Sequence, residues 1–322
     1  MHKSSKKLVI DADTHITDIY RLSSEQKSKF INIKNYYHGR PINLEQLLLE
    51  MNLSDIDMSL AWQNPACTIY TKNKDDNYNT LWNANLYIAN CAYKYPNRII
   101  PAGWTDPIAL GTEKAKEIAQ RCIFELGFPI IKMNPAQNSY QIDSPFVFEI
   151  LDSIIDAGGI PAFHYGSDTP YTRPENFEKV VSRYPDVPFI GVHMGGGGAS
   201  YIEAEDVYQE SRELGLKYTN LRFILSSKRD THIESDFITY QLAGEPYCQN
   251  LFCGSDAPYG NQAWNFGGFR SLLESFTKSD NYPDQRIKNN PNLFTPESIA
   301  GYLGVNFATL LVATYEKLIR YI

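Results

Sequence analysis

Carboxylate and imidazole side chains follow a short apolar run near the start of the chain. Residues 8–10 read as a buried strand, and Asp11, Asp13 and His15 come directly after them. Side chains alternate between the two faces of a strand, so these three are predicted to project the same way. A divalent metal ion would satisfy all three when they are buried. An acidic turn that contains a histidine is the alternative.

Residues of the same types end three other apolar runs. His164 follows residues 160–163, His193 follows residues 188–192, and Asp256 follows residues 251–253 after a Gly-Ser pair. A lone histidine is usually a packing or surface residue. If these runs are strands of one sheet, however, their ends predict a shared metal site that also includes Asp13 and His15.

Apolar runs alternate with helical patterns along the whole chain. Short βα units in series imply parallel strands with right-handed crossovers, and eight of them imply a closed (β/α)8 TIM barrel. An open doubly wound sheet is the alternative, but no Gly-rich dinucleotide motif follows the first strand. Strands are predicted near 8–15, 58–62, 99–104, 129–133, 160–163, 188–192, 221–225 and 251–253, and helices at 44–53, 77–95, 112–125, 145–157, 174–183, 203–214 and 234–242.

In such a barrel the functional side chains lie at the carboxyl ends of the strands. Asp13, His15, His164, His193 and Asp256 all fall there. We expect one barrel domain over residues 1–322, with a loop insertion at 16–42 and a helical C-terminal extension at 263–322.

Composition narrows the possible partners. The chain has 322 residues, 43% hydrophobic and 21% charged, with a net charge of -7, which argues against nucleic-acid binding through bulk electrostatics. No run is long and apolar enough to predict a membrane span. The five cysteines show no C-x-x-C pair, so reduced thiols and a cytoplasmic location are expected.

Several motifs together resemble the amidohydrolase superfamily, in particular the branch that contains aminocarboxymuconate-semialdehyde decarboxylase. The resemblance implies a TIM barrel of the metal-dependent hydrolase type, in which His15, His164 and Asp256 match ligand or catalytic positions. His193 matches a histidine that binds the metal or acts as acid or base beside it. The motifs are Ile-Asp-Ala-Asp-Thr-His at 10–15, Lys-Met-Asn-Pro at 132–135, Pro-Ala-Phe-His at 161–164, Gly-Val-His-Met-Gly-Gly at 191–196 and Phe-Cys-Gly-Ser-Asp at 252–256.

The chain departs from the superfamily's usual first-strand His-x-His motif, because Asp13 replaces the first histidine. The expected metal ligands are Asp13, His15, His164 and Asp256. They imply one divalent metal ion, with Zn²⁺ expected first and Mn²⁺ or Mg²⁺ as alternatives, since a carboxylate makes the site harder. Lys132 matches a region where two-metal relatives carry a carboxylated lysine, but here we expect it to pair with a carboxylate.

Three functions fit these residues. The first is hydrolysis of a small amide, lactone or related carbonyl compound by a metal-activated water, with Asp256 and His193 as catalytic residues. The second is nonoxidative decarboxylation of a small aromatic or unsaturated carboxylic acid, in which Asp256 or His193 protonates the carbon. The third is a barrel without metal that serves as a binding or scaffold protein.

Loop residues are the candidates for substrate contact. Arg229 could bind a carboxylate, and the aromatic side chains of Trp62, Tyr165 and Trp264 could line a pocket. The expected partner is a small-molecule substrate, with a homodimer possible and no nucleic acid or membrane involved.

Overall fold

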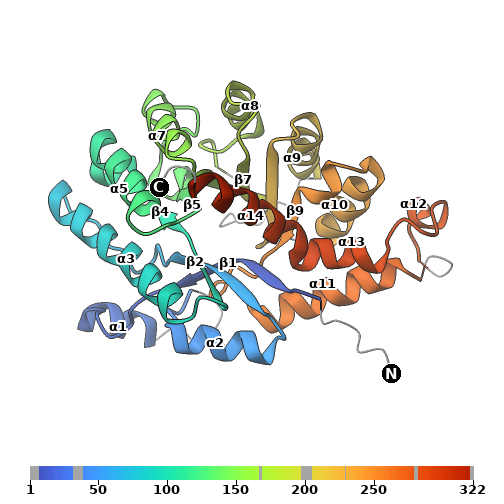
Figure 1. Ribbon diagram of the computed structural model, residues 1–322, viewed down its shortest axis with the longest axis horizontal. Coiled ribbons are helices and arrows are strands. Elements are labelled where there is room, and N and C mark those ends of the chain that lie inside the picture. The colour runs from blue at the N-terminus through green and yellow to red at the C-terminus, as the bar shows by residue number, and fades with distance from the viewer. Residues whose placement is uncertain are drawn as a thin grey trace.

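A closed barrel of parallel strands forms the centre of the molecule, and helices surround it (Figure 1). The computed structural model describes residues 7–31, 39–166, 169–196, 205–228, 230–278 and 282–319. This architecture confirms the predicted (β/α)8 barrel. The strands are β1 Ile10–Ile16, β2 Met58–Gln63, β3 Ile99–Pro101, β4 Gly103–Trp104, β5 Ile130–Met133, β6 Ile160–Gly166, β7 Phe189–Gly195, β8 Leu221–Leu225 and β9 Leu251–Cys253.

Two seams close the sheet. The segments β3 and β4 together make one strand of the barrel. The amide of Ala102, which lies between them, donates to the carbonyl of Ala61 of β2 at 3.1 Å. At the other seam, the amide of Asp256 donates to the carbonyl of Asp13 at 2.8 Å. The second seam therefore places two predicted site residues side by side, although 243 positions separate them in the chain.

Most helices begin and end where local signals predict. Asn43 forms a capping box at the start of α2. Asn73 caps α3, which begins at Lys74, three residues before the predicted start. The helices are α1 Ser24–Ile31, α2 Leu44–Leu53, α3 Lys74–Lys94, α4 Pro107–Leu110, α5 Thr112–Phe124, α6 Pro135–Asn138, α7 Pro145–Asp156, α8 Pro174–Arg183, α9 Glu205–Lys217, α10 Asp230–Ala243, α11 Gln262–Phe276, α12 Gln285–Lys288, α13 Pro296–Ala300 and α14 Asn306–Ile319.

The predicted insertion and extension are both partly helical. Residues 16–42 contain α1, and residues 263–322 contain most of α11 and all of α12, α13 and α14. The continuous helical stretch Pro296–Ile319 is long and apolar enough by composition to span a membrane, so the prediction that no run of the chain would be is wrong. Such a stretch is weak evidence for a span, and Phe307 within it packs on Phe252 of β9 with ring centroids 5.0 Å apart.

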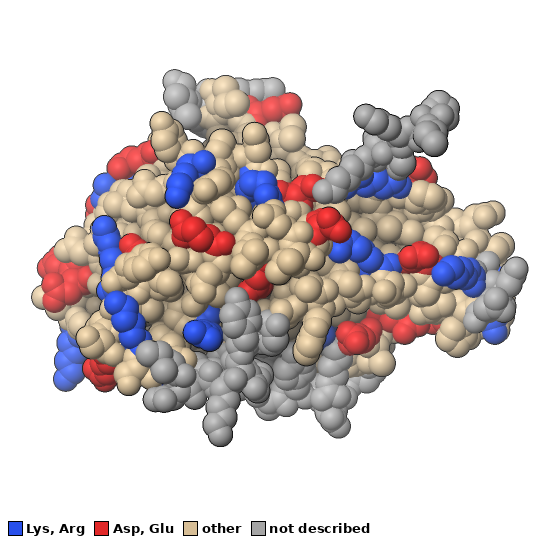
Figure 2. Space-filling model, turned by 90° about the horizontal axis from the view of Figure 1, so that it is seen from below, with Lys and Arg blue, Asp and Glu red and all other residues tan. Residues whose placement is uncertain are grey.

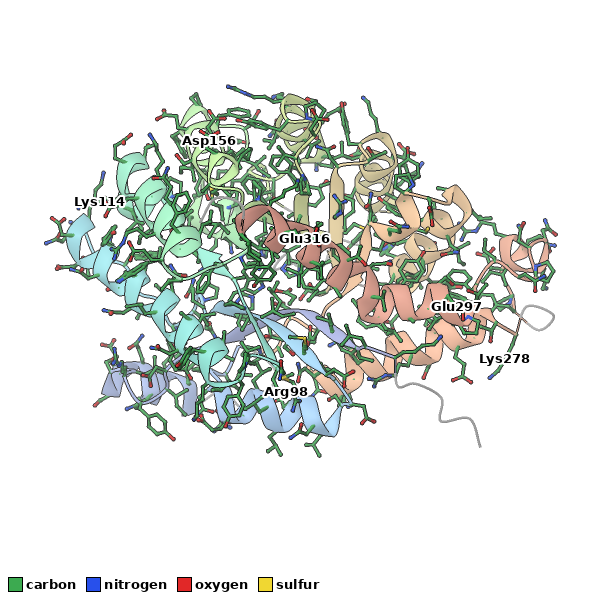
Figure 3. The ribbon with its side chains drawn as sticks, in the orientation of Figure 1. Arg98, Lys114, Asp156, Lys278, Glu297 and Glu316 are labelled. Atoms are coloured by element: carbon green, nitrogen blue, oxygen red, sulfur yellow. The ribbon has the colours of Figure 1, made fainter. Side chains whose placement is uncertain are left out.

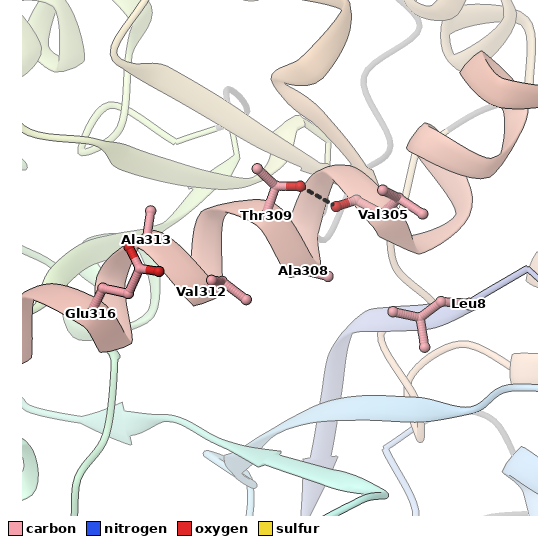
Figure 4. Close-up of a pocket in the computed structure, with 7 residues that line it drawn as sticks. All are labelled: Leu8, Val305, Ala308, Thr309, Val312, Ala313 and Glu316. Carbon is pink, nitrogen blue, oxygen red and sulfur yellow. Dashed lines mark hydrogen bonds between the residues drawn. The ribbon is translucent and has the colours of Figure 1, made fainter. Parts of the chain in front are cut away.

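Helix α14 crosses the amino-terminal end of the barrel (Figure 1). An apolar groove lies there, and Figure 4 draws the residues that line it. The groove encloses about 360 Å³. It is at the opposite end of β1 from Asp13 and His15, so it plays no part in the predicted site. Its lining is Leu8, Val305, Ala308, Thr309, Val312, Ala313 and Glu316.

Charged side chains lie mostly on the outside. Over the described residues of the face in Figure 2, basic and acidic side chains are interspersed. Arg98, labelled in Figure 3, joins the starts of β2 and β3, since its Nε donates to the carbonyl of Asp57 at 2.8 Å. All five cysteines are free, as the sequence predicted.

Candidate metal centre

A bulge in β1 separates the two aspartates that the sequence predicted on one face. The register of β1 against β2 shifts between Asp11 and Thr14, so alternation does not continue across this point. Asp11 accepts bonds from Ser255 and from Gln262 Nε2 of α11, whereas Asp13 accepts from Trp62 Nε1 at 2.9 Å. The prediction that Asp11 shares a face with Asp13 is therefore wrong.

Asp13 is the centre of a buried polar cluster at the carboxyl end of the barrel. Its Oδ2 accepts from Ser226 Oγ at 2.7 Å, and its Oδ1 lies 3.6 Å from Lys132 Nζ. Burial by itself raises the pKa of this carboxyl, but Lys132 and the neighbouring His193 and His15 outweigh it, so the net pKa falls. The structure thus confirms the expected pairing of Lys132 with a carboxylate.

His15 directs a lone pair between two carboxylates. Its Nδ1 lies 2.8 Å from the carbonyl of Gln63, which can only accept, so Nδ1 carries the proton. Its Nε2 lies 3.6 Å from Asp13 Oδ1 and 3.5 Å from Asp256 Oδ1. Burial, followed by the charge of Lys132, lowers the pKa of His15 to about 3, so the ring is neutral. Three electron-pair donors converge, an arrangement that a divalent cation satisfies.

His193 lies beside the carboxylate oxygen of Asp13 that His15 does not approach. Its Nδ1 is 3.9 Å from Asp13 Oδ2 and 2.8 Å from Ser226 Oγ. Burial is the main reason that the pKa of His193 falls to about 4. The half-buried His164 packs edge-on beside it, with ring centroids 4.5 Å apart. Burial, and after it His193, also lowers the pKa of His164 well below the usual range.

Asp256 completes the cluster from the turn after β9. It accepts a hydrogen bond from Ser227 Oγ. Burial, followed by the charge of Asp13, raises its pKa well above the ordinary value. Asp256 has φ of 57° and His193 has φ of 79°, values that non-glycine residues adopt at some energetic cost. Such strain concentrates at functional sites, and both residues belong to the cluster around Asp13.

Among the described residues, the group with the spacing of a metal site is Asp13, His193 and Asp256. Their ligand atoms lie within 4.8 Å of one another, and all three residues are buried. Of the predicted ligands, Asp13 and Asp256 belong to this group. His15 adjoins it through Nε2, and His164 adjoins it through His193. One divalent metal ion fits this set of donors.

Two tryptophans and Lys132 form the floor beneath Asp13. Lys132 Nζ lies 4.9 Å from the Trp62 ring centroid and 5.3 Å from that of Trp104. Trp104 also contacts the ring of His15, with centroids 6.1 Å apart. The predicted substrate residue Trp62 is therefore in the site, where it holds Asp13.

The other predicted substrate residues are placed differently. Tyr165 lies on the outer face of β6, where its hydroxyl is 3.0 Å from Ser211 Oγ of α9 and its ring stacks on Phe223. This prediction is wrong, because alternation turns Tyr165 away from His164. Trp264 is 75% exposed in the first turn of α11, and Arg229 lies outside the described residues.

Sequence reasoning missed Ser226 and Ser227, which hold the two site carboxylates. Both directly follow the strand predicted at 221–225, so the rule that selected His164, His193 and Asp256 would have selected them as well. It also missed Trp104 and Tyr259, whose rings contact His15.

Comparison with known proteins identifies the class to which this fold and site belong. A family model described as Amidohydrolase matches residues 10–264. The chain therefore belongs to the amidohydrolase family, as its motifs suggested, and is an enzyme of that superfamily. No curated protein matches the chain.

Solved structures share the fold at low identity. The 2,6-dihydroxybenzoate decarboxylase from Rhizobium has a TM-score of 0.67 at 13% identity, covering 96% of this chain and 99% of that one. The 5-carboxyvanillate decarboxylase from Sphingomonas paucimobilis has a TM-score of 0.66 at 13% identity, covering 95% and 99%. A dihydroxybenzoic acid decarboxylase from Polaromonas sp. JS666, with bound manganese and 2-nitroresorcinol, has a TM-score of 0.66 at 13% identity, covering 95% and 97%.

Proposed function

We propose that this chain is a divalent-metal-dependent, nonoxidative decarboxylase of a small hydroxylated aromatic acid. The observation that carries the proposal is the convergence of Asp13, Asp256, His15 and His193 at the mouth of the barrel. The likeness over the whole chain to decarboxylases of hydroxybenzoic acids supports the same reaction. Hydrolysis, the first expectation from the sequence, is the second candidate, because the family model is described as Amidohydrolase.

Each site residue has a role in this reaction. Asp13, His193 and Asp256 would hold the metal together with His15, and manganese fits because carboxylates are hard ligands and a structural neighbour contains it. The metal would supply positive charge that holds the substrate carboxylate and an adjacent hydroxyl. Lys132 adds a second positive charge 3.6 Å from Asp13.

Proton transfer to the ring is the step that the protein must provide. The bond between the ring carbon and the carboxylate breaks, the carboxylate leaves as CO₂, and the ring carbon accepts one proton. Asp256 is the proposed donor, because Ser227 fixes one of its oxygens while the other faces the centre of the cluster beside His15. His193, held by Ser226, supports the metal.

The test separates the two reactions by their products. Manganese-loaded protein is incubated with 2,6-dihydroxybenzoate and 5-carboxyvanillate, and separately with a panel of amides and lactones. We expect CO₂ and the decarboxylated phenol in equal amounts, with Asp256→Asn slowing the reaction about 100-fold or more. Asp143→Asn, whose carboxylate pairs with Lys179 of α8 outside the cluster, should leave the rate unchanged. A carboxylic acid formed from an amide or lactone, without CO₂ from the aromatic acids, would instead establish hydrolysis.

A further inference from the structure

Three buried polar atoms in the loops at the carboxyl end of the barrel have no hydrogen-bond partner among the residues that the structure describes. They are Asn64 Nδ2, Tyr70 Oη and Tyr140 Oη. Leaving a buried donor unpaired costs about 1–3 kcal/mol, and native proteins contain few such groups. Three of them in neighbouring loops at one end of the barrel point to a ligand that pairs with them.

Strand alternation places Asn64 above the metal centre. Trp62 faces the barrel interior, where it bonds Asp13, and Asn64 follows two residues later. Asn64 Oδ1 accepts from Tyr259 Oη at 2.8 Å, and the Tyr259 ring lies edge-on to His15 with centroids 5.6 Å apart. The unpaired Nδ2 of Asn64 is therefore one layer from the metal ligands, towards the barrel mouth.

The same alternation places Asp106 at the level of Asn64, between the metal ligands and the barrel mouth. Trp104 faces the interior beside His15, whereas Thr105 turns outward and bonds the carbonyl of Ala115. Asp106 again points inward and is 1% exposed. Its Oδ1 accepts from the amides of Ile108 and Ala109 at 2.9 and 3.1 Å, so the carboxylate is held in a fixed position.

The two tyrosines approach this layer from loops. Tyr70 lies between β2 and α3, and Tyr140 follows α6 and is 4% exposed. Burial raises the pKa of both phenols, and the charge of Asp106 raises them further, so both hydroxyls stay protonated close to this carboxylate. This end of the barrel thus offers two phenol donors beside a fixed acceptor, with the amide donor of Asn64 at the end of the neighbouring strand.

The balance of donors and acceptors indicates which group would bind. A second carboxylate would be repelled by Asp106, whereas a hydroxyl can donate to Asp106 and accept from a phenol or amide. We propose that Asn64, Tyr70 and Tyr140 form, with Asp106, a subsite for a ring hydroxyl of the substrate, separate from the groups that bind the metal. This inference rests on the proposed function and narrows its substrates to acids with at least one additional hydroxyl.

Binding measurements test the subsite without relying on turnover. The probes are 2-hydroxybenzoate and the 2,3-, 2,4-, 2,5- and 2,6-dihydroxybenzoates, titrated calorimetrically into manganese-loaded protein. We expect one dihydroxy isomer to bind about 10-fold or more tightly than 2-hydroxybenzoate, because a site built to pair with a hydroxyl rejects analogues that lack it. Tyr140→Phe and Tyr70→Phe should each reduce this preference and leave the binding of 2-hydroxybenzoate unchanged.

Thermal unfolding distinguishes a binding hydroxyl from a structural one. Tyr70 forms no hydrogen bond that Tyr70→Phe would lose, so the Tm of this ligand-free variant should stay the same or rise. Tyr302→Phe is the matched control, because its buried hydroxyl donates to Gln241 Oε1 at 2.7 Å. This control should lower Tm and leave the isomer preference unchanged.

Several results would overturn the subsite. They are equal binding of all five acids by the wild type, an isomer preference that survives both Phe variants, and a fall in the Tm of Tyr70→Phe like that of Tyr302→Phe. Release of CO₂ is measured separately. If CO₂ is released and the Phe variants keep the isomer preference of the wild type, the subsite is rejected but the decarboxylase is not. If the isomer preference behaves as expected but no CO₂ is released, the decarboxylase is rejected but the subsite is not.

Discussion

The hydroxyl proton of Ser226 determines which nitrogen of His193 is protonated. Its Oγ donates to Asp13 Oδ2 and must therefore accept from His193 Nδ1, which then carries a proton. His193 Nε2 is left with a free lone pair, the form that a metal ligand needs. One hydroxyl thus orients a carboxylate and selects the tautomer of an imidazole.

Replacing Ser226 should weaken metal binding. Ser226→Ala removes both bonds, so Asp13 and His193 lose their fixed orientation, and the affinity for Mn²⁺ should fall about 10- to 100-fold. Calorimetric titration of Mn²⁺ into metal-free protein measures the change. Ser275→Ala is the control, since that hydroxyl bonds the carbonyl of Leu272 within α11. An unchanged affinity in Ser226→Ala would show that the hydroxyl does not position the ligands.

Asp106 should make stability depend on pH. Burial raises its pKa in the folded protein above the value of 3.8 expected for an unfolded chain, so folding favours the protonated form. The stability that Asp106 contributes is present below its pKa in the unfolded chain, and it is lost as the pH rises through its pKa in the folded protein. Asp106→Asn keeps a capping oxygen but does not titrate. Relative to this variant, the metal-free wild type should be less stable at pH 7 than at pH 4.

Urea unfolding of both proteins at the two pH values measures this difference. The tyrosines that face Asp106 do not titrate in this range, because burial raises their pKa values. A wild type that gains stability relative to Asp106→Asn on going from pH 4 to pH 7 would contradict the assignment.

At the scale of elements, the close contact between the ends of β7 and β8 shapes the site. A run of four glycines begins at Gly195, which has φ of 87°, a value that favours glycine. A Cβ on Gly196 would lie 2.7 Å from the carbonyl oxygen of Ser227. The loop that carries Ser226 and Ser227 therefore packs closely against the end of β7. Gly197 and Gly198 lie outside the described residues.

Adding one methyl group at this contact should disturb the site. Gly196→Ala forces the two backbones apart, which should cost about 1–3 kcal/mol of stability and weaken Mn²⁺ binding. Gly267→Ala is the matched control, because open space surrounds this glycine inside α11. That variant should be about 0.5–1 kcal/mol more stable, with unchanged metal affinity. Denaturant unfolding and calorimetry measure both effects, and equal behaviour of the two variants would argue against the contact.

At the scale of the whole molecule, the metal should link strands that are distant in sequence. Its proposed ligands come from β1, from β7 and from the turn after β9, on both sides of the seam that closes the barrel. A metal that binds the folded state stabilises it by about 2.7 kcal/mol when free metal is 100 times the Kd. Mn²⁺ should therefore raise Tm, and a chelator should reverse the shift. Asp13→Asn should lose the response, and an unchanged Tm in the wild type would exclude a site that spans the seam.

The sequence predicted most of the fold because its signals are local. Helix α8 begins and ends at the predicted residues, and β8 and β9 do so as well. Caps, prolines and apolar periodicity act over a few residues, so they are readable without the rest of the chain. The same local reading placed Asp13, His15, His164, His193 and Asp256 at strand ends, where the barrel rule makes them converge.

Other features depended on contacts between distant segments. The bulge in β1 that turns Asp11 towards Gln262, and the seam that joins Asp13 to Asp256, arise when β1 pairs with its neighbours in the closed barrel. The sequence determined which residues could do chemistry and at which strand ends they lie. The tertiary structure decided which of them meet, because their distances depend on barrel closure and packing rather than on spacing along the chain.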